Sequence, residues 1–332
     1  MEFLEATLAR AKSLQKRLVM TGGTEIETLE AAKVVMTERL ASSVTLLGKE
    51  SEINKVATRE GVDISDMSIV NPELCPDLSK YTNEYFELRK MRGMTMEQAK
   101  IDIVKPLNWG AMMVRLGAAD AVVAGVNDDS VDVFFAGLAI IGTAPNIRTA
   151  SSCTIVVGKD LSMGVDGAFI FSDCSIVTNP LPDQLSDIAQ CAAQSCRDLL
   201  RVEPVVALLS HSTKGLKREH KDIEKIRIAL DMIKYREPSL IVDGELQVNA
   251  ALVPSITDAR VPDTPVRGKV NTLIFPDMDA GNIAYQTARV FGKAEVFGPF
   301  LQGFAKPISY ISRGSELSSA VITCAATLVR VH

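Results

Sequence analysis

The sequence predicts an α/β protein of two domains. Along the first third of the chain, short apolar runs typical of buried strands alternate with amphipathic helical patterns, which indicates βαβ units and a mainly parallel sheet. The chain has 332 residues, which is long for a single core. Hydrophobic residues make up 47% of it and aromatic residues 5%, so the core is mostly aliphatic and an α/β architecture is favoured over an all-β sandwich.

The first domain is expected to hold residues 1–148 and the C-terminal residues 299–332. We predict strands at 16–22, 42–48, 67–72 and 121–125. Helices are predicted at 2–15, 24–38, 50–60, 78–91, 95–104, 106–117, 129–141 and, near the C-terminus, 315–330. Glycines mark several strand ends, but no GxGxxG follows the first strand, so a dinucleotide-binding fold of that type is not supported.

The second domain is expected over residues 149–298, because the pattern changes after 143–148. The apolar runs 151–160 and 167–177 are separated by a turn rich in Gly and Asp, which predicts a hairpin and therefore an antiparallel edge. Strands are then predicted at 205–210 and 272–277, and helices at 182–201, 216–235 and 244–252.

Charge and cysteine usage exclude several classes of protein. The formal net charge of −5 argues against nucleic acid as a partner. The six cysteines show no CxxC pair, which favours free thiols in a reducing cytoplasm. We see no signal peptide and no apolar run of membrane length, so we expect a cytoplasmic protein without a membrane partner. Three scattered histidines, of which only His211 lies in a plausible site, make a zinc site or a catalytic triad improbable.

Two segments near the C-terminus have the chemistry of anion sites. The strand TLIFPD leads through Gly281 and Asn282 into a helix, and a helix start leaves backbone N–H groups free to face an anion. About thirty residues later comes Ser312-Arg313-Gly314, in which a planar guanidinium, a hydroxyl and a glycine stand together. An arginine can hold a phosphate through two parallel hydrogen bonds. The sequence therefore predicts a phosphate site here, with a solvated surface arginine as the alternative.

A third candidate is the turn ALLSHSTKG. The hydroxyls of Ser210, Ser212 and Thr213 precede Gly215 and a predicted helix, which suits an anion. An ordinary capped helix is the alternative.

The fourth candidate is a basic cluster, Arg89-Lys90 with Arg92, followed by a glycine. It is either a solvated helix face or a contact for a phosphate-bearing ligand.

Several of these segments also carry a resemblance. The chain is similar to the phosphate acetyltransferase (phosphotransacetylase) family in the motifs DAGNIAY, GPFLQGFAKP and SRG and, in its middle, in YFELRKMRGMT, FIFSDCSIVTNP, ALLSHSTKG and IVDGELQVNAALVP. The similarity covers nearly the whole length. It implies two α/β domains with an interdomain cleft, like those of isocitrate and isopropylmalate dehydrogenases, with the last helix packing on the first domain.

The resemblance also implies a reaction and a set of partners. The expected reaction is reversible transfer of an acetyl group between acetyl phosphate and coenzyme A, in which the thiolate attacks the acyl carbonyl directly. Coenzyme A is then a substrate, no cofactor is bound permanently, no metal is needed, and the protein is expected to be a homodimer.

Roles for single residues follow from the same resemblance. Ser312 and Arg313 would lie in the acyl phosphate site, where Arg313 neutralises the phosphate, and Arg89 would face the phosphates of coenzyme A. Asp173 and Asn179 would help to close the cleft or position the phosphate.

Two positions depart from the family pattern. Phe135 stands where the family shows an arginine that anchors coenzyme A, and Ser319 stands where it shows an aspartate, the expected base for the coenzyme A thiol. Ser319 is expected near coenzyme A but cannot accept a proton at neutral pH. A thiol with a pKa of about 8.5 is already partly ionised at pH 7. Glu316 precedes Ser319 by three residues, which on a helix places both on one side, and is our candidate for the displaced base.

Alternatives to the acetyltransferase remain open. A wider acyl pocket would give a phosphate propionyl- or butyryltransferase. The departures at Phe135 and Ser319 would also fit a catalytically degenerate homologue that acts as a binding protein. A metal- and NAD-dependent decarboxylating dehydrogenase of related fold lacks support, because its expected cluster of aspartates and its tyrosine–lysine pair are not seen in the sequence.

Overall fold

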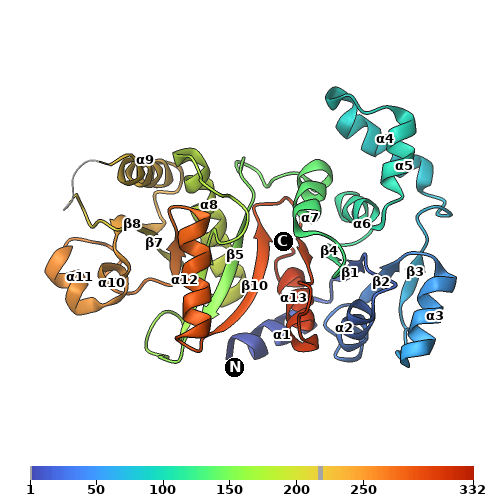
Figure 1. Cartoon of the computed structure of the whole chain (residues 1–332), viewed down its shortest axis with the longest axis horizontal. Coiled ribbons are helices and arrows are strands. Elements are labelled where there is room, and N and C mark those ends of the chain that lie inside the picture. Colours follow the sequence, from blue (N-terminus) through green and yellow to red (C-terminus); the bar gives the residue numbers. More distant parts are fainter. Residues whose placement is uncertain (1, 216–219) are drawn as a thin grey trace. The chain divides into compact units, whose positions relative to one another are not determined.

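The computed structural model describes residues 2–215 and 220–332. It comprises two compact units, unit 1 with residues 3–145 and 304–332 and unit 2 with residues 146–303 (Figure 1). Each unit contains a sheet with flanking helices, which confirms the predicted α/β class. None of the helices in the described part is both long and apolar enough to cross a lipid bilayer.

Unit 1 is built on a five-stranded sheet with the strand order β11-β4-β1-β2-β3, in which all neighbours are parallel. The strands are β1 (Arg17–Met20), β2 (Ser43–Leu47), β3 (Ser68–Val70), β4 (Ala121–Ala124) and β11 (Ile308–Tyr310). The first four were predicted. The sequence analysis did not assign β11, because three residues are too few to show a strand period.

The helices of unit 1 follow the predicted pattern closely. They are α1 (Glu2–Leu14), α2 (Ile26–Thr37), α3 (Glu50–Glu60), α4 (Leu78–Arg89), η1 (Lys90–Arg92), α5 (Met96–Ile103), α6 (Pro106–Arg115), α7 (Ser130–Ala136), η2 (Gly137–Ile141) and α13 (Leu317–Leu328). The helix predicted over 129–141 widens into a π-helical turn at η2. The last helix, α13, packs against α2 and β4 of the same unit, which confirms what the resemblance implied.

Unit 2 has a six-stranded mixed sheet with the order β10-β5-β6-β9-β7-β8. Strands β5 and β6 form the predicted antiparallel hairpin, and β6, β9, β7 and β8 are parallel to one another. The strands are β5 (Ser151–Val157), β6 (Ala168–Ser172), β7 (Val205–Leu209), β8 (Ile241–Leu246), β9 (Thr272–Ile274) and β10 (Glu295–Gln302).

Strand β10 was not predicted. It pairs antiparallel with β5, and its register shifts between Phe297 and Phe300. The intervening Gly298-Pro299 interrupts the apolar run, which is why the sequence showed no strand period there. Because of this pairing, residues 299–303 belong to unit 2, although they were predicted in the first domain. Residues 146–148 were also predicted in the first domain and also belong to unit 2.

The helices of unit 2 are α8 (Pro182–Ser195), η3 (Cys196–Leu200), α9 (Lys221–Arg236), α10 (Val248–Leu252), α11 (Pro254–Arg260) and α12 (Met278–Val290). The helix predicted over 244–252 was wrong in its first part. Residues 244–246 continue β8 as a buried strand because they pair with β7, and the helix begins at Val248. Of the helix predicted over 216–235, residues 216–219 lie outside the described part.

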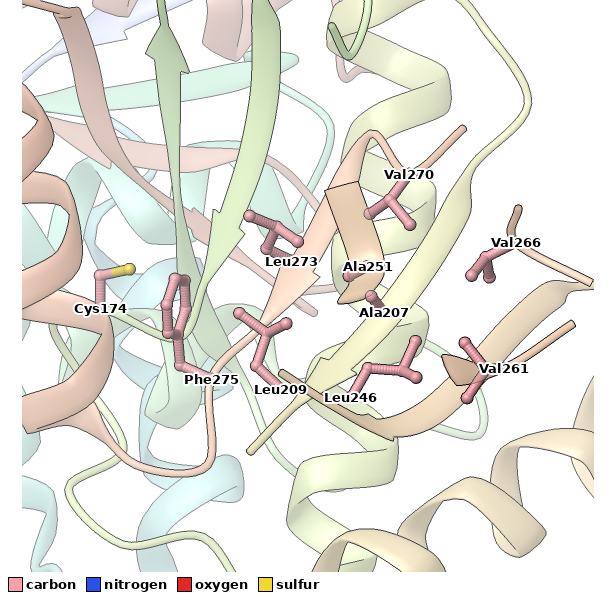
Figure 2. Close-up of a cluster of buried hydrophobic side chains, with 10 residues drawn as sticks. All are labelled: Cys174, Ala207, Leu209, Leu246, Ala251, Val261, Val266, Val270, Leu273 and Phe275. Carbon is pink, nitrogen blue, oxygen red and sulfur yellow. The ribbon is translucent and has the colours of Figure 1, made fainter. Parts of the chain in front are cut away.

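A buried apolar cluster joins the strands of unit 2 to its shorter helices (Figure 2). Leu273 on β9 lies near its centre, with Leu209 and Leu246 on neighbouring elements. The other members are Cys174, Ala207, Ala251, Val261, Val266, Val270 and Phe275. This cluster packs at the carboxyl ends of β7, β8 and β9, from which the turns that contain residues 210–213 and 277–282 begin.

Substituting Leu273→Ala should destabilise unit 2 by about 2–5 kcal/mol, because the lost methyl groups leave a cavity between three strands. Leu161→Ala is the matched control, since Leu161 is 65% exposed in the hairpin turn and should change stability by about 0.5 kcal/mol or less. Urea unfolding followed by circular dichroism measures both. Equal losses for the two variants would contradict the assignment of Leu273 to the core.

Candidate active site

The Ser312-Arg313-Gly314 turn lies directly after β11 in unit 1. The backbone N–H of Ile311 donates to the carbonyl of Ala124 at 3.0 Å, which continues the parallel pairing of β11 with β4. The N–H of Ser315 then donates to the carbonyl of Ser312 at 3.0 Å and closes a turn in which Gly314 has φ +75°. Ser312 is half-buried and Arg313 is exposed. The structure thus presents a guanidinium at the carboxyl edge of a parallel sheet.

Glu316 and Ser319 lie at the start of α13, but not as predicted. The helix begins at Leu317, and Glu316 is its N-cap residue with an extended backbone (φ −66°, ψ 154°). The turn at Gly314 separates β11 from the helix and delays its start, so the helix does not extend back to 315. Glu316 is exposed and Ser319 is half-buried at the third helical position. The direction of the Glu316 side chain is therefore not set by helical spacing.

Arg89 ends α4 and faces a hollow of about 340 Å³. Within the described residues, its Nε is buried and has no hydrogen-bond partner. Arg92 borders the same hollow, and a capping box between Thr95 and Gln98 fixes the adjoining start of α5. Two guanidinium groups around one hollow suit an anionic group. The predicted basic cluster is therefore brought together in unit 1.

Phe135 lies on α7 and is 60% exposed. Its ring meets that of Phe134 edge to face with centroids 5.9 Å apart, and Phe134 meets Phe304 in the same way at 5.7 Å. This aromatic row offers an apolar surface and no hydrogen-bond donor, so it can stack on a ligand but cannot pair with a phosphate.

In unit 2, the loop after β7 is held by internal hydrogen bonds. The hydroxyls of Ser212 and Thr213 are fully buried. Ser212 Oγ donates to Glu245 Oε1 at 3.3 Å, and Thr213 Oγ1 accepts from the N–H of Gln247 at 3.0 Å. Ser210 is half-buried and accepts from the N–H of Ser212 at 3.1 Å. Of the three predicted phosphate ligands, Ser212 and Thr213 are therefore occupied with fixing the loop to β8 and α10.

Glu245 is the buried carboxylate on which this loop depends. Arg227 on α9 donates to it from Nε at 3.0 Å and from a terminal nitrogen at 3.1 Å, and the N–H of Gly215 donates at 2.7 Å. Burial by itself would raise the pKa of the Glu245 carboxyl, but these hydrogen bonds outweigh it and hold the pKa below its usual value. The sequence analysis missed Arg227, because a contact between α9 and β8 leaves no signal in local spacing.

The backbone N–H groups at the start of α12 also have hydrogen-bond partners within the protein. Asp277 is the N-cap, and its carboxylate accepts from the N–H of Ala280 at 2.8 Å. The N–H of Met278 donates to the carbonyl of Thr178 at 3.0 Å, and that of Gly281 to the carbonyl of Asp277 at 3.2 Å. The free amides that the sequence led us to expect at this turn are thus largely engaged by the protein itself.

Gly281 and Asn282 on α12 contact the segment that follows β6, which contains Asp173 and Cys174. A Cβ on Gly281 would lie 2.4 Å from the carbonyl oxygen of Asp173, so the close approach of α12 requires glycine. Asn282 Nδ2 donates to the carbonyl of Cys174 at 3.2 Å. Both residues therefore position the segment that contains Asp173.

Asp173 is buried, and its carboxylate accepts from the backbone N–H groups of Ser175 at 2.9 Å and Val177 at 2.9 Å and from the Ser152 hydroxyl. Burial raises the pKa of the Asp173 carboxyl, and these hydrogen bonds oppose the shift without cancelling it. Asn179 follows on the surface side and accepts from Lys225 Nζ at 3.0 Å. Hydrogen bonds from several elements therefore fix the position of this segment.

No group of three or more His, Cys, Asp or Glu side chains within residues 2–215 and 220–332 is arranged to hold a metal ion. His211 is exposed, and its ring lies 6.1 Å from that of His220.

Comparison with known proteins places the chain in a family. The sequence pattern of the phosphate acetyl/butaryl transferase family matches residues 2–328. A phosphate acetyltransferase from Treponema pallidum is 44% identical over 332 residues, covering 99% of each chain. A phosphotransacetylase structure from Streptococcus pyogenes superimposes with a TM-score of 0.93 at 30% identity, covering 99% of this chain and 98% of its own.

The fold extends beyond that family. A Salmonella typhimurium protein described as a candidate 4-hydroxythreonine-4-phosphate dehydrogenase has a TM-score of 0.56 at 10% identity, over 95% of this chain and 99% of its own. At this identity the likeness shows the fold alone.

Replacing Arg227 by Met should destabilise unit 2 at neutral pH by about 1–3 kcal/mol, because Glu245 is left buried and charged while half of the arginine is already exposed to water. The depressed pKa of Glu245 gives stability that is complete above the unfolded value of about 4.3 and is lost as the pH falls through the folded value. The difference in Tm between the variant and the unaltered protein should therefore shrink as the pH falls below about 5.

The control for this experiment is Arg289→Met, an exposed arginine in the last turn of α12. It should change Tm little at any pH. A Tm difference for Arg227→Met that stays constant from neutral to acidic pH would show that the ion pair does not govern the stability of this loop.

Proposed function

The chain belongs to the phosphate acetyl/butaryl transferase family, and we propose that it is a phosphate acetyltransferase, an acyltransferase that interconverts acetyl phosphate and coenzyme A with acetyl-coenzyme A and phosphate. The observation that carries this conclusion is the family match over residues 2–328, together with 44% identity to a phosphate acetyltransferase along the whole chain. Substrates of this class carry phosphate, and the exposed Arg313 and the Arg89–Arg92 hollow offer cations to receive it.

The proposed reaction is a direct displacement at the acyl carbon. The thiolate sulfur of coenzyme A forms a bond to the carbonyl carbon, the bond from that carbon to the phosphate oxygen breaks, and phosphate leaves with the electron pair. Arg313 would neutralise the charge that grows on the leaving phosphate, with Ser312 as a nearby hydroxyl donor. Its guanidinium suits this role because it stays charged and presents a planar pair of donors.

Binding of coenzyme A is assigned to unit 1. Arg89 lines the hollow of unit 1, where its guanidinium would contact a phosphate of the coenzyme, and Arg92 would add a second cation. Phe135 cannot pair with a phosphate, so its exposed ring would contribute apolar or stacking contact instead. Ser319 is half-buried at the start of α13 and would lie beside the coenzyme without acting as a base.

In unit 2, the residues predicted to bind phosphate fall into two groups, one that would contact the substrate and one that would hold the loops in place. Ser210 has the only partly exposed side chain among Ser210, Ser212 and Thr213, and it is the one that would face the substrate. Ser212 and Thr213 would hold its loop through Glu245 and Gln247. Gly281 and Asn282 would act in the same indirect way, by placing the segment around Asp173.

We further propose a cytoplasmic homodimer. Six cysteines without a disulfide within the described residues fit a reducing compartment. Exposed Ile283, Val290 and Phe291 at α12 would be covered in a dimer. Sedimentation of the purified protein as a monomer at micromolar concentration would refute the dimer.

The test of function is release of phosphate from acetyl, propionyl and butyryl phosphates in the presence and absence of coenzyme A. We expect coenzyme A-dependent release with acetyl phosphate as the best substrate. A preference for butyryl phosphate would assign the longer acyl group instead, and no release from any of the three would leave a protein that binds without catalysis.

In the same assay, Arg313→Ala should lower kcat by about 100-fold, because loss of one charged contact to the developing anion costs about 3 kcal/mol. Lys306→Ala, which removes an exposed cation seven residues earlier, is the matched control and should leave kcat unchanged. A variant at Arg313 that turns over as fast as the unaltered enzyme at saturating substrate would remove this residue from the mechanism.

Our second mechanistic prediction concerns the group that accepts the proton of the coenzyme A thiol. If Glu316 accepts it, Glu316→Gln should lower kcat at pH 7 and lose less at about pH 9, where the thiol ionises without help. Ser319→Asp should raise kcat at pH 7, because it places a carboxylate at the position where the family shows one. Glu295→Gln, an exposed acid elsewhere in the chain, is the control. An unchanged pH–rate profile for Glu316→Gln would show that the thiol ionises unaided.

A further inference from the structure

The sheet of unit 1 contains a crevice that is already filled by a side chain. The strand order β11-β4-β1-β2-β3 runs outward in both directions from the neighbours β1 and β4. In open parallel sheets, ligands bind outside the carboxyl ends of the two strands where the order reverses, often with phosphate on loop amides. Here the loops after β1 and β4 meet around the carboxylate of Glu25.

Glu25 uses both carboxylate oxygens on a loop a hundred residues away. Its Oε2 accepts from the backbone N–H of Val126 at 2.7 Å, and its Oε1 from that of Asn127 at 3.2 Å. Thr28 Oγ1 also donates to Oε2 at 3.0 Å. Glu25 is the N-cap residue of α2, yet its side chain makes no capping bond to that helix. The carboxylate thus takes the place that an anionic ligand would have on the amides of the β4–α7 loop.

Two glycines make room for this carboxylate. A Cβ on Gly22 would lie 2.2 Å from Glu25 Oε2, and a Cβ on Gly125 would lie 2.1 Å from the same atom. Neither glycine has a positive φ, so glycine is needed here for space and not for backbone conformation. A Cβ on Gly125 would also lie 2.7 Å from the Cα of Gly22, so the close approach of the two loops requires glycine at 125 as much as the enclosed carboxylate does.

A second bridge lies beside the first. Thr21 Oγ1 donates to Asp128 Oδ2 at 2.6 Å, and the N–H of Gly125 donates to both Thr21 Oγ1 and Asp128 Oδ2 at 3.1 Å. Asp128 is a second acidic residue at these two loops, and it has the same sign as Glu25. The pair therefore disfavours an anionic ligand at this point and instead ties the β1 and β4 loops to each other.

The fixed loop is the support of the Ser312-Arg313 turn. Ala124 immediately precedes Gly125, pairs with Tyr310 on β11, and accepts the hydrogen bond from the N–H of Ile311 at 3.0 Å. Ser312 follows at once. Any shift of residues 124–127 would therefore be passed through one backbone hydrogen bond to the turn that presents Arg313.

We propose that Glu25 is a positioning residue: its carboxylate acts as an internal anion that fills the crevice between β1 and β4, fixes the β4–α7 loop and thereby holds the Ser312-Arg313 turn in its working geometry. The expected effect on kcat rests on the proposed acetyl transfer. The expected effect on the position of the loop does not depend on that function. Glu25 touches no substrate in this account, so its loss should lower kcat more than it changes KM for coenzyme A.

The experiment compares Glu25→Ala with Glu27→Ala, which removes an exposed carboxylate from the first turn of the same helix. In the phosphate-release assay, Glu25→Ala should lower kcat by about tenfold or more, since small displacements of a contacting group are costly, while Glu27→Ala should not. Formate, a small carboxylate that fits the vacated space, should restore part of kcat in Glu25→Ala and have no such effect on the other proteins. Turnover of Glu25→Ala equal to that of Glu27→Ala would overturn the proposal.

Amide hydrogen exchange supplies a readout that needs no activity. Exchange in residues 124–128 and 311–314 should speed up in Glu25→Ala and slow again with formate, while the rest of the sheet keeps its protection. Faster exchange over the whole of unit 1, without a response to formate, would mean a general structural loss and overturn the inference. If the unaltered protein has no transferase activity but the exchange result holds, the proposed function fails and the positioning role stands.

Glu25→Gln keeps the volume of the side chain and covers the case in which the alanine variant does not fold. Its amide group turns one acceptor into a donor that faces a backbone N–H, so exchange at residues 124–128 should still speed up and kcat should still fall. A glutamine variant that matches the unaltered protein in both measurements would overturn the proposal.

Discussion

The parallel pairing of β11 with β4 determines where the Ser312-Arg313 turn lies. These residues follow unit 2 in the chain, and only the return of β11 to the sheet of unit 1 places them at the carboxyl ends of β4 and β1. The pairing covers three residues, so it depends on its surroundings for stability: α13 packs on β11 and β4 from the following segment, and the loop after β4 is tied to the loop after β1. This topology places the exposed Arg313, our proposed phosphate ligand, at the carboxyl edge of the sheet.

In unit 2, the loops at the ends of the parallel strands are held in place by hydrogen bonds. Buried carboxylates accept these bonds. Glu245 gathers a guanidinium, a backbone amide and a hydroxyl, and Asp173 gathers three backbone amides and a hydroxyl. A buried charge is costly unless every lone pair finds a donor, so each carboxylate fixes all the groups that satisfy it. The loops therefore present few free side chains, and Ser210 is the half-buried exception in its turn.

The sequence allowed the fold to be predicted in most of its elements, because the long helices and the buried strands of unit 1 carry strong periods. It failed for β10 and β11, where a Gly-Pro step and a length of three residues remove the period, and for residues 244–246, where a polar-looking DGEL segment is in fact a buried strand. The candidate site residues were proposed from motifs and from resemblance. Arg227 and Glu25, which hold the neighbouring loops in place, could not be found in this way. Each makes its hydrogen bonds to residues far away in sequence, and nothing in the residues next to it indicates that contact.

The same carboxylate pattern decides how this protein can recognise phosphate. Loop and helix-start amides are common phosphate ligands, and the sequence indicated such sites at the turns before α12 and after β7. In the structure, Asp277 and Glu245 occupy amides at those turns, and Glu25 occupies the amides at the crevice of unit 1. A phosphate that approaches these places meets negative charge instead of free N–H groups. The guanidinium groups of Arg313, on its turn, and of Arg89 and Arg92, around their hollow, are the cations that we propose for phosphate recognition. The buried carboxylates thus fix the loops through internal hydrogen bonds, and the exposed arginines remain the groups that we propose to bind the substrate.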